Sequence, residues 1–370
     1  MGDTKNQVSL RPFAHQVGGH SNFQQFDNHT VCKPLFSKEL KFYQEIPSAL
    51  KPFIPQFKGV VTAEIKEDYE GEPSLIIHPN GPVHFVSDDI SKDLSGSDDD
   101  IQNPCDVDEE KDRPHLRGPT SSCHSQRQFL ILENVISRYH SPSILDLKMG
   151  TQIHSDSKTS EEEMKRRRSK WEKTTARTLG VRLGGMKVYH VDCGKCFYMN
   201  NNDGRKLSEH GFEKALRMFF DNGETFRCAL ISCFIQKLKN VLDVMEKDLC
   251  SYRFYNSSLL LVYEGEVAGY SKRNESDCFT NTSNHHSTHD TSLEQCTCEC
   301  TSEQLDIRMI DFQHVSRDDS HADKSCCVTC PDKGYIFGLK SLIRILRKIQ
   351  NDHHRGRKES LTDGSGKDAS

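Results

Sequence analysis

Two apolar segments of the chain carry charges that restrict how it can fold. The segment SPSILDLKMGT holds Asp146 and Lys148 between apolar side chains, and LDIRMIDFQHV holds Asp311 and His314 near its end. Buried charges are costly unless they are paired, hydrogen-bonded or bound to a metal. Because alternate residues of a strand face the same side, we expect Asp146 and Lys148 to share one face. The fold must therefore bring partners or ligands to these positions.

For either segment alone, a structural salt bridge at a strand end is an adequate explanation. Lys33 lies on a third short strand, and the three positions together favour one shared site. Mg²⁺ prefers oxygen ligands, which suits Asp311, whereas Lys33 and Lys148 suit phosphate oxygens. Phosphoryl transfer needs positioning, metal and positive charge more than covalent help from the protein. These residues therefore indicate a phosphate-handling cleft with a metal ion.

Several functional classes are disfavoured by what the sequence lacks. It contains neither the H-R-D-x-x-x-x-N loop of protein kinases nor the G-x-x-x-x-G-K-[ST] loop of P-loop enzymes. The net charge of −5 argues against specific binding to nucleic acid or attraction to an anionic membrane. No apolar run reaches about 18 residues, so we expect no membrane insertion.

The cysteines and the N-terminal residues indicate a reducing compartment. The N-terminal stretch MGDTKNQVSLRPF lacks the apolar core of a secretory signal. The 15 cysteines are then expected to be reduced thiols in the cytoplasm, the nucleus or both. CTCEC (296–300) and CCVTC (326–330) leave a zinc clip open as an alternative, although neither has the regular paired spacing of common zinc modules.

The pattern of apolar residues predicts an α+β protein interrupted by polar segments. Hydrophobic residues make up only 34% of the chain, so some of its length is expected to be disordered. The expected disordered segments are residues 86–126, 267–304, 316–331 and 351–370. Helices are expected over residues 37–47 (capped by Ser37), 159–180, 208–223, 227–247 and 334–350. Strands are expected over 29–35, 57–65, the start of 127–139, 251–265 and 305–315, with a hairpin over 181–191 and 195–200.

Three motifs, in this order, resemble those of the inositol polyphosphate kinase family. PSILDLKMG (142–150) has the P-x-x-x-D-x-K-x-G pattern of that family. SSLLLVYEG (257–265) is similar to its Ser-Leu-Leu segment, and MIDFQHV (309–315) to its Ile-Asp-Phe motif. HQVGGH (15–20), followed by HTVCKPLFSKELKFYQEIP, most resembles the inositol hexakisphosphate kinase branch. Together these motifs are highly specific.

The resemblance implies a two-lobed fold related to protein kinases, with an ATP cleft between the lobes. The N-lobe would comprise residues 1–132, the hinge 133–137 and the larger C-lobe 138–350. The implied activity is ATP- and Mg²⁺-dependent transfer of the γ-phosphoryl group to a phosphate of inositol hexakisphosphate, which forms a diphosphoinositol pyrophosphate. A monomer is expected.

Two other functions stay open at this point. A multikinase or inositol trisphosphate kinase of the same family would phosphorylate a ring hydroxyl instead. A phosphoinositide- or partner-binding module with vestigial catalysis is the second alternative, although the intact Asp146, Lys148 and Asp311 argue against it.

The resemblance also implies roles for single residues. Glu133 and Val135 would meet adenine through their backbone, and Asp146 would bind the ribose hydroxyls. Lys33, paired with Glu39, would bind the phosphates of ATP. Catalysis is assigned to Lys148 and Asp311, with Lys148 touching the γ-phosphate and the inositol phosphate, Asp311 ligating Mg²⁺ beside Ser258, and His314 near the acceptor.

A basic segment offers a wall for a highly anionic acceptor. Residues 165–187 contain nine Lys or Arg and only one acidic residue, Glu172. The candidate acceptor-binding residues are Lys165, Arg166, Arg167, Lys170 and Arg182. Successive helix positions rotate by about 100°, so only a subset can face the site. The alternative is a solvated helix face, or a nuclear-localisation-like KRRR run.

Overall fold

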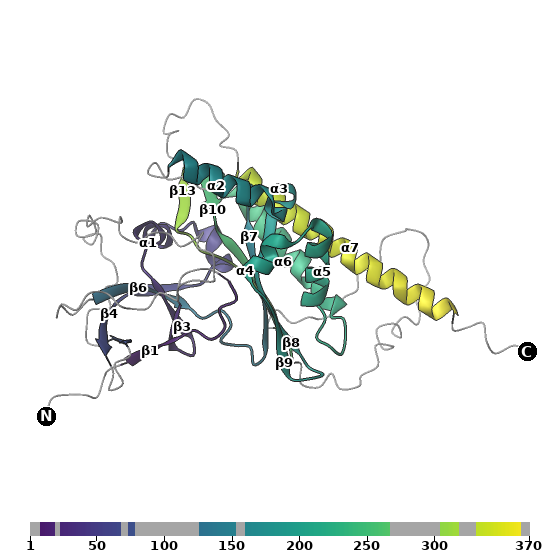
Figure 1. Ribbon diagram of the computed structural model, residues 1–370, viewed down its shortest axis with the longest axis horizontal. Coiled ribbons are helices and arrows are strands. Elements are labelled where there is room, and N and C mark those ends of the chain that lie inside the picture. The colour runs from purple at the N-terminus through teal and green to yellow at the C-terminus, as the bar shows by residue number, and fades with distance from the viewer. Residues whose placement is uncertain are drawn as a thin grey trace, which may run out of the picture.

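The computed structural model describes residues 8–18, 23–67, 73–77, 126–152, 160–266, 304–317 and 331–363. The predicted disordered segments 86–126 and 267–304 fall almost entirely outside this part of the chain, as do both cysteine clusters. The described residues form a strand barrel and, beside it, an open sheet covered by helices (Figure 1).

Six antiparallel strands close into the N-terminal barrel, in the order β1-β2-β3-β6-β4-β5. They are β1 (Val8–Pro12), β2 (Gln24–Asp27), β3 (Thr30–Pro34), β4 (Phe57–Glu67), β5 (Pro73–Ile77) and β6 (Gln126–Glu133). A helix, α1 (Ser37–Gln44), and a short 3-10 helix, η1 (Ser48–Phe53), connect β3 to β4. Closure leaves the barrel without an unpaired edge, which suits a small sheet whose interior must stay dry.

The C-terminal part is built on a five-stranded antiparallel sheet in the order β12-β11-β7-β8-β9. Its strands are β7 (Pro142–Met149), β8 (Val181–His190), β9 (Lys195–Met199), β11 (Ser258–Glu264) and β12 (Leu305–Ile310). A second, two-stranded sheet pairs β10 (Tyr252–Tyr255) with β13 (His314–Arg317). The predicted hairpin over 181–200 is confirmed as β8 and β9.

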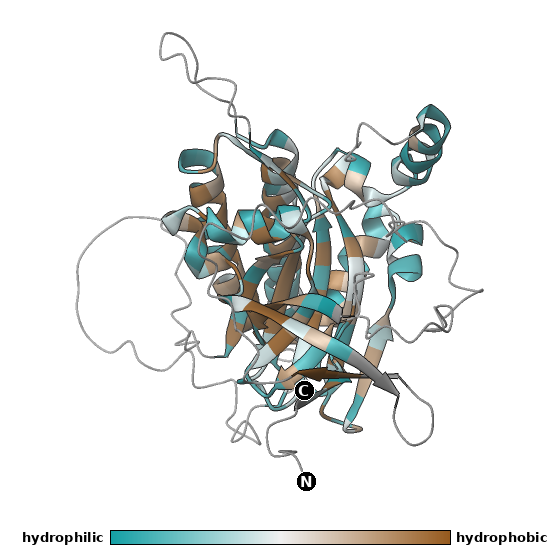
Figure 2. Cartoon of the chain, turned by 90° about the vertical axis from the view of Figure 1, so that its left-hand side faces the viewer, coloured by the Kyte–Doolittle hydropathy of each residue, from teal (hydrophilic) through white to brown (hydrophobic). Residues whose placement is uncertain are grey.

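Amphipathic helices bury one face of this sheet. They include α5 (Glu209–Phe219), α6 (Cys228–Lys247) and α7 (Lys333–Asp363), and α4 (Asn201–Lys206) precedes them. Ser208 caps α5 by accepting from the backbone N–H of Gly211, as expected for serine at this position. The apolar colouring in Figure 2 lies mainly on the strands and on the helix faces turned towards them. The largest core cluster runs from Leu130 in the barrel to Leu145 in the sheet, so both parts share apolar packing.

The helices differ from expectation in three places. The segment 159–180 forms two helices, α2 (Glu161–Glu172) and α3 (Thr175–Leu179), because Thr174 turns extended and caps the second one. The N-cap of α1 is Phe36, without a side-chain cap, so the prediction for Ser37 was wrong. The predicted disordered tail from 351 was also wrong as far as Asp363, because α7 continues to that residue.

Two predicted strands are broken by residues with positive φ. The segment 251–265 divides into β10 and β11 around Asn256, whose φ is 53°. The segment 305–315 divides into β12 and β13 around Asp311, whose φ is 65°. A positive φ is uncommon for a residue other than glycine, and such backbone strain tends to occur at functional sites. Among the described helices, none has the length and apolar character needed to cross a membrane.

Candidate active site

A buried lysine on the barrel is the starting point of the site. Lys33 lies on β3, is 1% exposed, and its Nζ is 2.8 Å from Glu39 Oε1 and 2.9 Å from Asp311 Oδ1. Burial alone lowers the pKa of Lys33, but the carboxylates of Asp311 and Glu39 more than offset this and raise the pKa. Lys33 is therefore charged and fixed in position where barrel and sheet meet.

Asp311 receives a second lysine from the sheet. Its Oδ2 accepts from Lys148 Nζ at 2.8 Å, and the Ser258 hydroxyl lies 3.5 Å from the same oxygen. Burial would raise the pKa of Asp311, but Lys148 and Lys33 hold it far below its usual range. The carboxylate is thus ionised, and each of its oxygens is held by one ammonium group. The structure brings these predicted residues together from four different strands or their ends.

Helix α1 supports this cluster from behind. Glu39 is fully buried, and its Oε1 accepts from the backbone N–H of Phe312 at 3.0 Å as well as from Lys33. The Phe312 ring packs 4.4 Å from the Phe42 ring and 5.6 Å from the Tyr43 ring, centroid to centroid. The bond from Phe312 and this ring packing fix the strained backbone next to Asp311.

Asp146 lies two positions before Lys148 on β7 and is 2% exposed. Its Oδ2 is 3.8 Å from Lys148 Nζ, so the two side chains share a face, as predicted. Its Oδ1 is buried and has no hydrogen-bond partner among the described residues. Burial raises the pKa of Asp146, with the positive charge of Lys148 opposing the shift. The backbone of Gly18 packs directly against this carboxylate, because a Cβ at Gly18 would overlap it.

A pocket between the barrel and the sheet opens onto Lys33, Asp146 and Asp311. Its other lining residues come from the segment between β1 and β2, from β3, and from the end of β6 with the residues after it, including Phe13, Gly18, Phe23, Val31, Leu132, Glu133, Asn134, Val135 and Ile136. The backbone N–H of Val135 makes no hydrogen bond to any residue in the described ranges. The predicted hinge residues therefore border the same pocket as the charged cluster.

Arg308, which the sequence did not single out, connects Glu133 of the predicted hinge to residues of both parts of the molecule. Its Nη1 donates to the backbone oxygens of Pro52 and Ile54, each at 3.1 Å, and its Nε donates to Asp306 at 2.9 Å. Its Nη2 is 3.7 Å from the carboxylate of Glu133. Arg308 lies in the apolar strand that the sequence predicts around Asp311. A charged arginine inside such a strand was the sequence signal that could have identified it.

The predicted acceptor-binding residues lie on three separate elements. Arg182 lies on β8 directly across from Lys148, and its Nη1 donates to Asn201 Oδ1 at 2.7 Å. His314 begins β13, three residues after Asp311. The remaining candidates, all exposed or half-buried on α2, are Lys165, Arg166, Arg167 and Lys170. The structure brings Arg182 into register with the cluster, whereas these four stay on a separate helix.

On α2, Glu163 forms salt bridges with two of these basic residues. Glu163 Oε2 accepts from Arg166 Nε at 2.8 Å, and Glu163 Oε1 accepts from Arg167 Nε at 2.9 Å. These bonds lower the pKa of Glu163 to about 2.

The donor atoms present fit a hard divalent cation. Asp311 and Ser258 offer oxygen ligands, and the unpartnered Oδ1 of Asp146 lies nearby on the adjacent strand. Magnesium takes oxygen ligands and usually shares them with phosphates and water, so an incomplete protein ligand set is what it requires. The two lysines supply positive charge for anionic oxygens. The arrangement can thus hold a nucleotide phosphate chain with its metal.

Comparisons with known proteins agree on one family. The model of the inositol polyphosphate kinase family matches residues 129–347. Inositol hexakisphosphate kinase 3 of Homo sapiens is 34% identical, over 94% of this chain and 97% of that protein. Inositol hexakisphosphate kinase 1 of Mus musculus is 32% identical, over 94% of each.

A solved structure shares the fold at lower sequence identity. The crystal structure of the inositol phosphate multikinase Ipk2 from S. cerevisiae, in complex with ADP and Mn²⁺, has a TM-score of 0.52 and 20% identity. The match covers 87% of this chain and 99% of that one. It confirms the predicted two-lobed α+β fold.

Proposed function

This chain belongs to the inositol polyphosphate kinase family and is an inositol phosphate kinase, and we propose that its acceptor is inositol hexakisphosphate. The reaction would transfer the γ-phosphoryl group of ATP to a phosphate of that acceptor and form a diphosphoinositol pyrophosphate. Relatives named inositol hexakisphosphate kinases, similar over nearly the whole chain, support this choice. The observation that carries the phosphoryl transfer is the Lys33–Asp311–Lys148 cluster at the pocket, in which Lys33 is buried and the other two side chains are partly exposed.

ATP would lie in the pocket between barrel and sheet, with adenine against the backbone of Glu133 and Val135. The N–H of Val135 has no hydrogen-bond acceptor within the described ranges, which supports this placement because an adenine ring nitrogen can accept from it. Asp146 would accept hydrogen bonds from the ribose hydroxyls. Its buried, unpartnered Oδ1 supports this role, because such an oxygen is costly to leave without a donor.

The phosphates would extend from the ribose towards Lys33 and Lys148. Asp311 and Ser258 would hold Mg²⁺, which when bound neutralises charge on the β- and γ-phosphate oxygens. The Mn²⁺ in the Ipk2 structure supports use of a divalent cation in this fold. Because Glu39 and Phe312 fix the Lys33–Asp311 pair before substrate arrives, little reorganisation is required during transfer.

The acceptor would approach from the side of Lys148 that faces β8. Arg182, across from Lys148, and His314, at the start of β13, are the proposed contacts nearest the cluster. We propose that a subset of Lys165, Arg166, Arg167 and Lys170 completes the wall. Arg166 and Arg167 would then exchange Glu163 for acceptor phosphates, which carry more charge per group.

The transfer itself needs few proton movements. An oxygen of the acceptor phosphate forms a bond to the γ-phosphorus while the bond from that phosphorus to the bridging oxygen breaks, and ADP leaves. A phosphate nucleophile is largely deprotonated at neutral pH, so no residue of this chain is assigned as a general base. Lys148 would stabilise the charge on the transferring group by touching both the γ-phosphate and the acceptor.

One experiment separates the three readings of the site. The purified protein is incubated with Mg·ATP and a panel of inositol phosphates, and the products are resolved by charge. A product more charged than inositol hexakisphosphate is the expected result. Preference for an acceptor with free hydroxyls would favour a multikinase or trisphosphate kinase, and absence of turnover with every acceptor would favour a binding module.

A further inference from the structure

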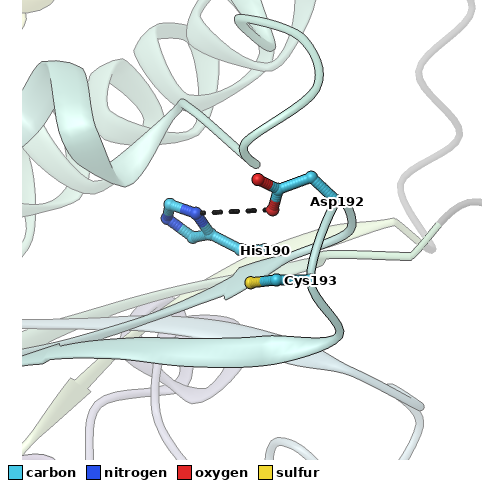
Figure 3. Close-up of side chains that lie close together, drawn as sticks. All are labelled: His190, Asp192 and Cys193. Atoms are coloured by element: carbon cyan, nitrogen blue, oxygen red, sulfur yellow. Dashed lines mark ion pairs between the residues drawn. The ribbon is translucent and has the colours of Figure 1, made fainter.

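A group of three metal-ligating side chains lies at the turn between β8 and β9, outside the proposed kinase site. His190, Asp192 and Cys193 each offer one ligand atom, and these atoms all lie within 4.8 Å of one another. Figure 3 shows the imidazole and the carboxylate turned towards each other, with the sulfur beside them. We propose that His190, Asp192 and Cys193 bind a zinc ion.

The spacing of the ligand atoms suits tetrahedral zinc. His190 Nδ1 and Asp192 Oδ1 are 3.8 Å apart. Zinc bonds of about 2.0–2.3 Å at tetrahedral angles place neighbouring ligand atoms about 3.3–3.7 Å apart. This pair is already close to that spacing, and since all three ligand atoms lie within 4.8 Å of one another, an inward movement of about 1 Å by side chains on a surface turn closes the site.

The backbone around the turn is fixed by contacts on two sides. Gly194, with a φ of 64°, donates its N–H to the His190 oxygen at 2.9 Å and closes the turn. The N–H of Val191 donates to the oxygen of Asn222 at 2.8 Å. Gly223, on that neighbouring loop, comes so near that a Cβ there would overlap Asp192. The ligands are therefore held on a preformed support, which reduces the entropy cost of binding.

The ligand types select the metal. A thiolate and an imidazole favour zinc over magnesium, which prefers oxygen ligands alone. The Cys193 thiol loses its proton when it ligates the ion, so binding releases one proton from the protein. His190 is 32% exposed and Asp192 is 51% exposed, which gives the ion access and leaves the fourth position for water or another ligand.

The site is separate from the phosphate cluster. Arg182, which lies across from Lys148, and His190 are eight positions apart on β8. At about 3.3 Å per strand residue they are about 26 Å apart. Zinc at the turn thus has no direct contact with the transferred phosphate, and the proposal does not depend on the identity of the acceptor.

Cys196 provides a matched control three positions away. In the hairpin, His190 pairs with Lys195, whereas Cys196 pairs with Tyr189. Because alternate residues of a strand face opposite sides, Cys196 lies on the other face of the hairpin from His190. The sequence also separates the two cysteines chemically, since trypsin cleaves after Lys195 and leaves Cys193 and Cys196 in different peptides.

Zinc protection of Cys193 from alkylation tests the site in the full-length protein. The reduced protein is treated with iodoacetamide with and without Zn²⁺, and peptides are quantified by mass spectrometry. Zinc should slow alkylation of Cys193 at least tenfold and leave the alkylation rate of Cys196 unchanged. His190→Gln and Asp192→Asn should each lessen the protection. Equal modification rates with and without zinc, or protection that persists in both variants, would overturn the proposal.

Cobalt spectroscopy supplies a second readout. Co²⁺ bound to a thiolate gives a charge-transfer band in the near ultraviolet, and cysteines elsewhere in the chain can contribute to it. Cys193→Ser should therefore bind one equivalent fewer than the unaltered protein, whereas Cys196→Ser should bind the same number. Kinase turnover of Cys193→Ser should be unchanged, which verifies that the variant is folded. Unchanged cobalt stoichiometry in Cys193→Ser would exclude the site.

Discussion

The ammonium group of Lys33 lies 2.9 Å from the carboxylate of Asp311, although 278 positions separate the two residues in the chain. One residue belongs to the barrel and the other follows the sheet strand β12, so this ion pair crosses between the two parts of the molecule. Asp311 also accepts a hydrogen bond from Lys148, and Lys33 also donates one to Glu39. Both lysines are thus oriented before any nucleotide binds.

Loss of the Lys148 ammonium should remove activity and leave the fold intact. Lys148→Ala is expected to lower kcat with Mg·ATP and inositol hexakisphosphate by about 10²–10³-fold, because the charge that develops on the transferring group loses a fixed cation. The Lys148 and Asp311 side chains are 18% and 20% exposed, and Asp311 keeps Lys33, so thermal unfolding should shift much less than in a variant that breaks the fully buried Lys33–Glu39 pair. Near-normal turnover in this variant would refute the assignment.

Truncation of Glu39 should destabilise the protein because it leaves Lys33 buried with one partner fewer. Glu39→Ala is expected to cost about 3–5 kcal/mol in chemical denaturation. Glu45→Ala, at the C-cap of the same helix, is the matched control. Its ion pair with Lys41 spans 3.9 Å between side chains that are more than half exposed, so its loss should change stability little. Similar losses in both variants would contradict the structural role of Glu39.

A nucleotide without ribose hydroxyls tests whether Asp146 binds the ribose. Asp146→Asn should weaken ATP binding about 10–100-fold, since a neutral amide is a poorer acceptor than a carboxylate. The unaltered protein should prefer ATP to 2′,3′-dideoxy-ATP, and the variant should lose most of this preference. A preference retained in full by Asp146→Asn would show that another group binds the ribose.

The same substitution has a predictable effect on stability. Burial raises the pKa of Asp146 in the folded protein, so its stabilising contribution is present below the unfolded pKa and is lost as pH rises through the folded pKa. Asp146→Asn should therefore be at least as stable as the unaltered protein at neutral pH. Lower stability of the variant at pH 7 would contradict this sign.

Asp311 should show the opposite dependence on pH. Its pKa is held far below the usual range by Lys148 and Lys33, despite burial, so its contribution is present above the unfolded pKa and is lost as pH falls. The stability difference between the unaltered protein and Asp311→Asn should be constant near neutral pH. Below about pH 4 it should shrink by about 1.4 kcal/mol per pH unit. A difference that does not change between pH 7 and pH 3 would argue against ion pairing.

Arg308 should support nucleotide binding through the hinge. Arg308→Ala is expected to cost about 2–4 kcal/mol of stability, since three hydrogen bonds are lost at once, and to raise the KM for ATP more than it lowers kcat. Lys237→Ala is the control, because Lys237 touches the same Asp306 only at 3.8 Å. Arg308→Lys should recover part of the ATP affinity. If Arg308 had only a structural role, the folded fraction of Arg308→Ala would keep the KM for ATP of the unaltered protein, and that result would contradict the prediction.

Some features of the site could be read from short stretches of sequence. A charge inside an apolar strand demands a partner, and alternation puts Asp146 and Lys148 on one face; both consequences hold in the structure. The amphipathic periods that predicted α5 and α6 are similarly local. These features depend on neighbours within a few positions, which the sequence displays directly.

Other features depend on residues far apart and could not be read in this way. The strand breaks at Asn256 and Asp311 require a positive φ, which is uncommon for residues other than glycine. The break at Asp311 is stabilised by long-range contacts such as the hydrogen bond from Phe312 to Glu39. The sequence grouped Arg182 with Lys165, Arg166, Arg167 and Lys170 as candidates, whereas the structure separates Arg182 from these four on α2.

The sequence by itself determined which residue types must meet a partner and the family to which the chain belongs. Only the tertiary structure decided which partners meet: Lys33 with Asp311, Arg308 with Glu133, and His190 with Cys193 at the turn of a predicted hairpin. The physical reason is that pairing of a buried charge is set by desolvation and distance in space, which the order of residues along the chain does not specify.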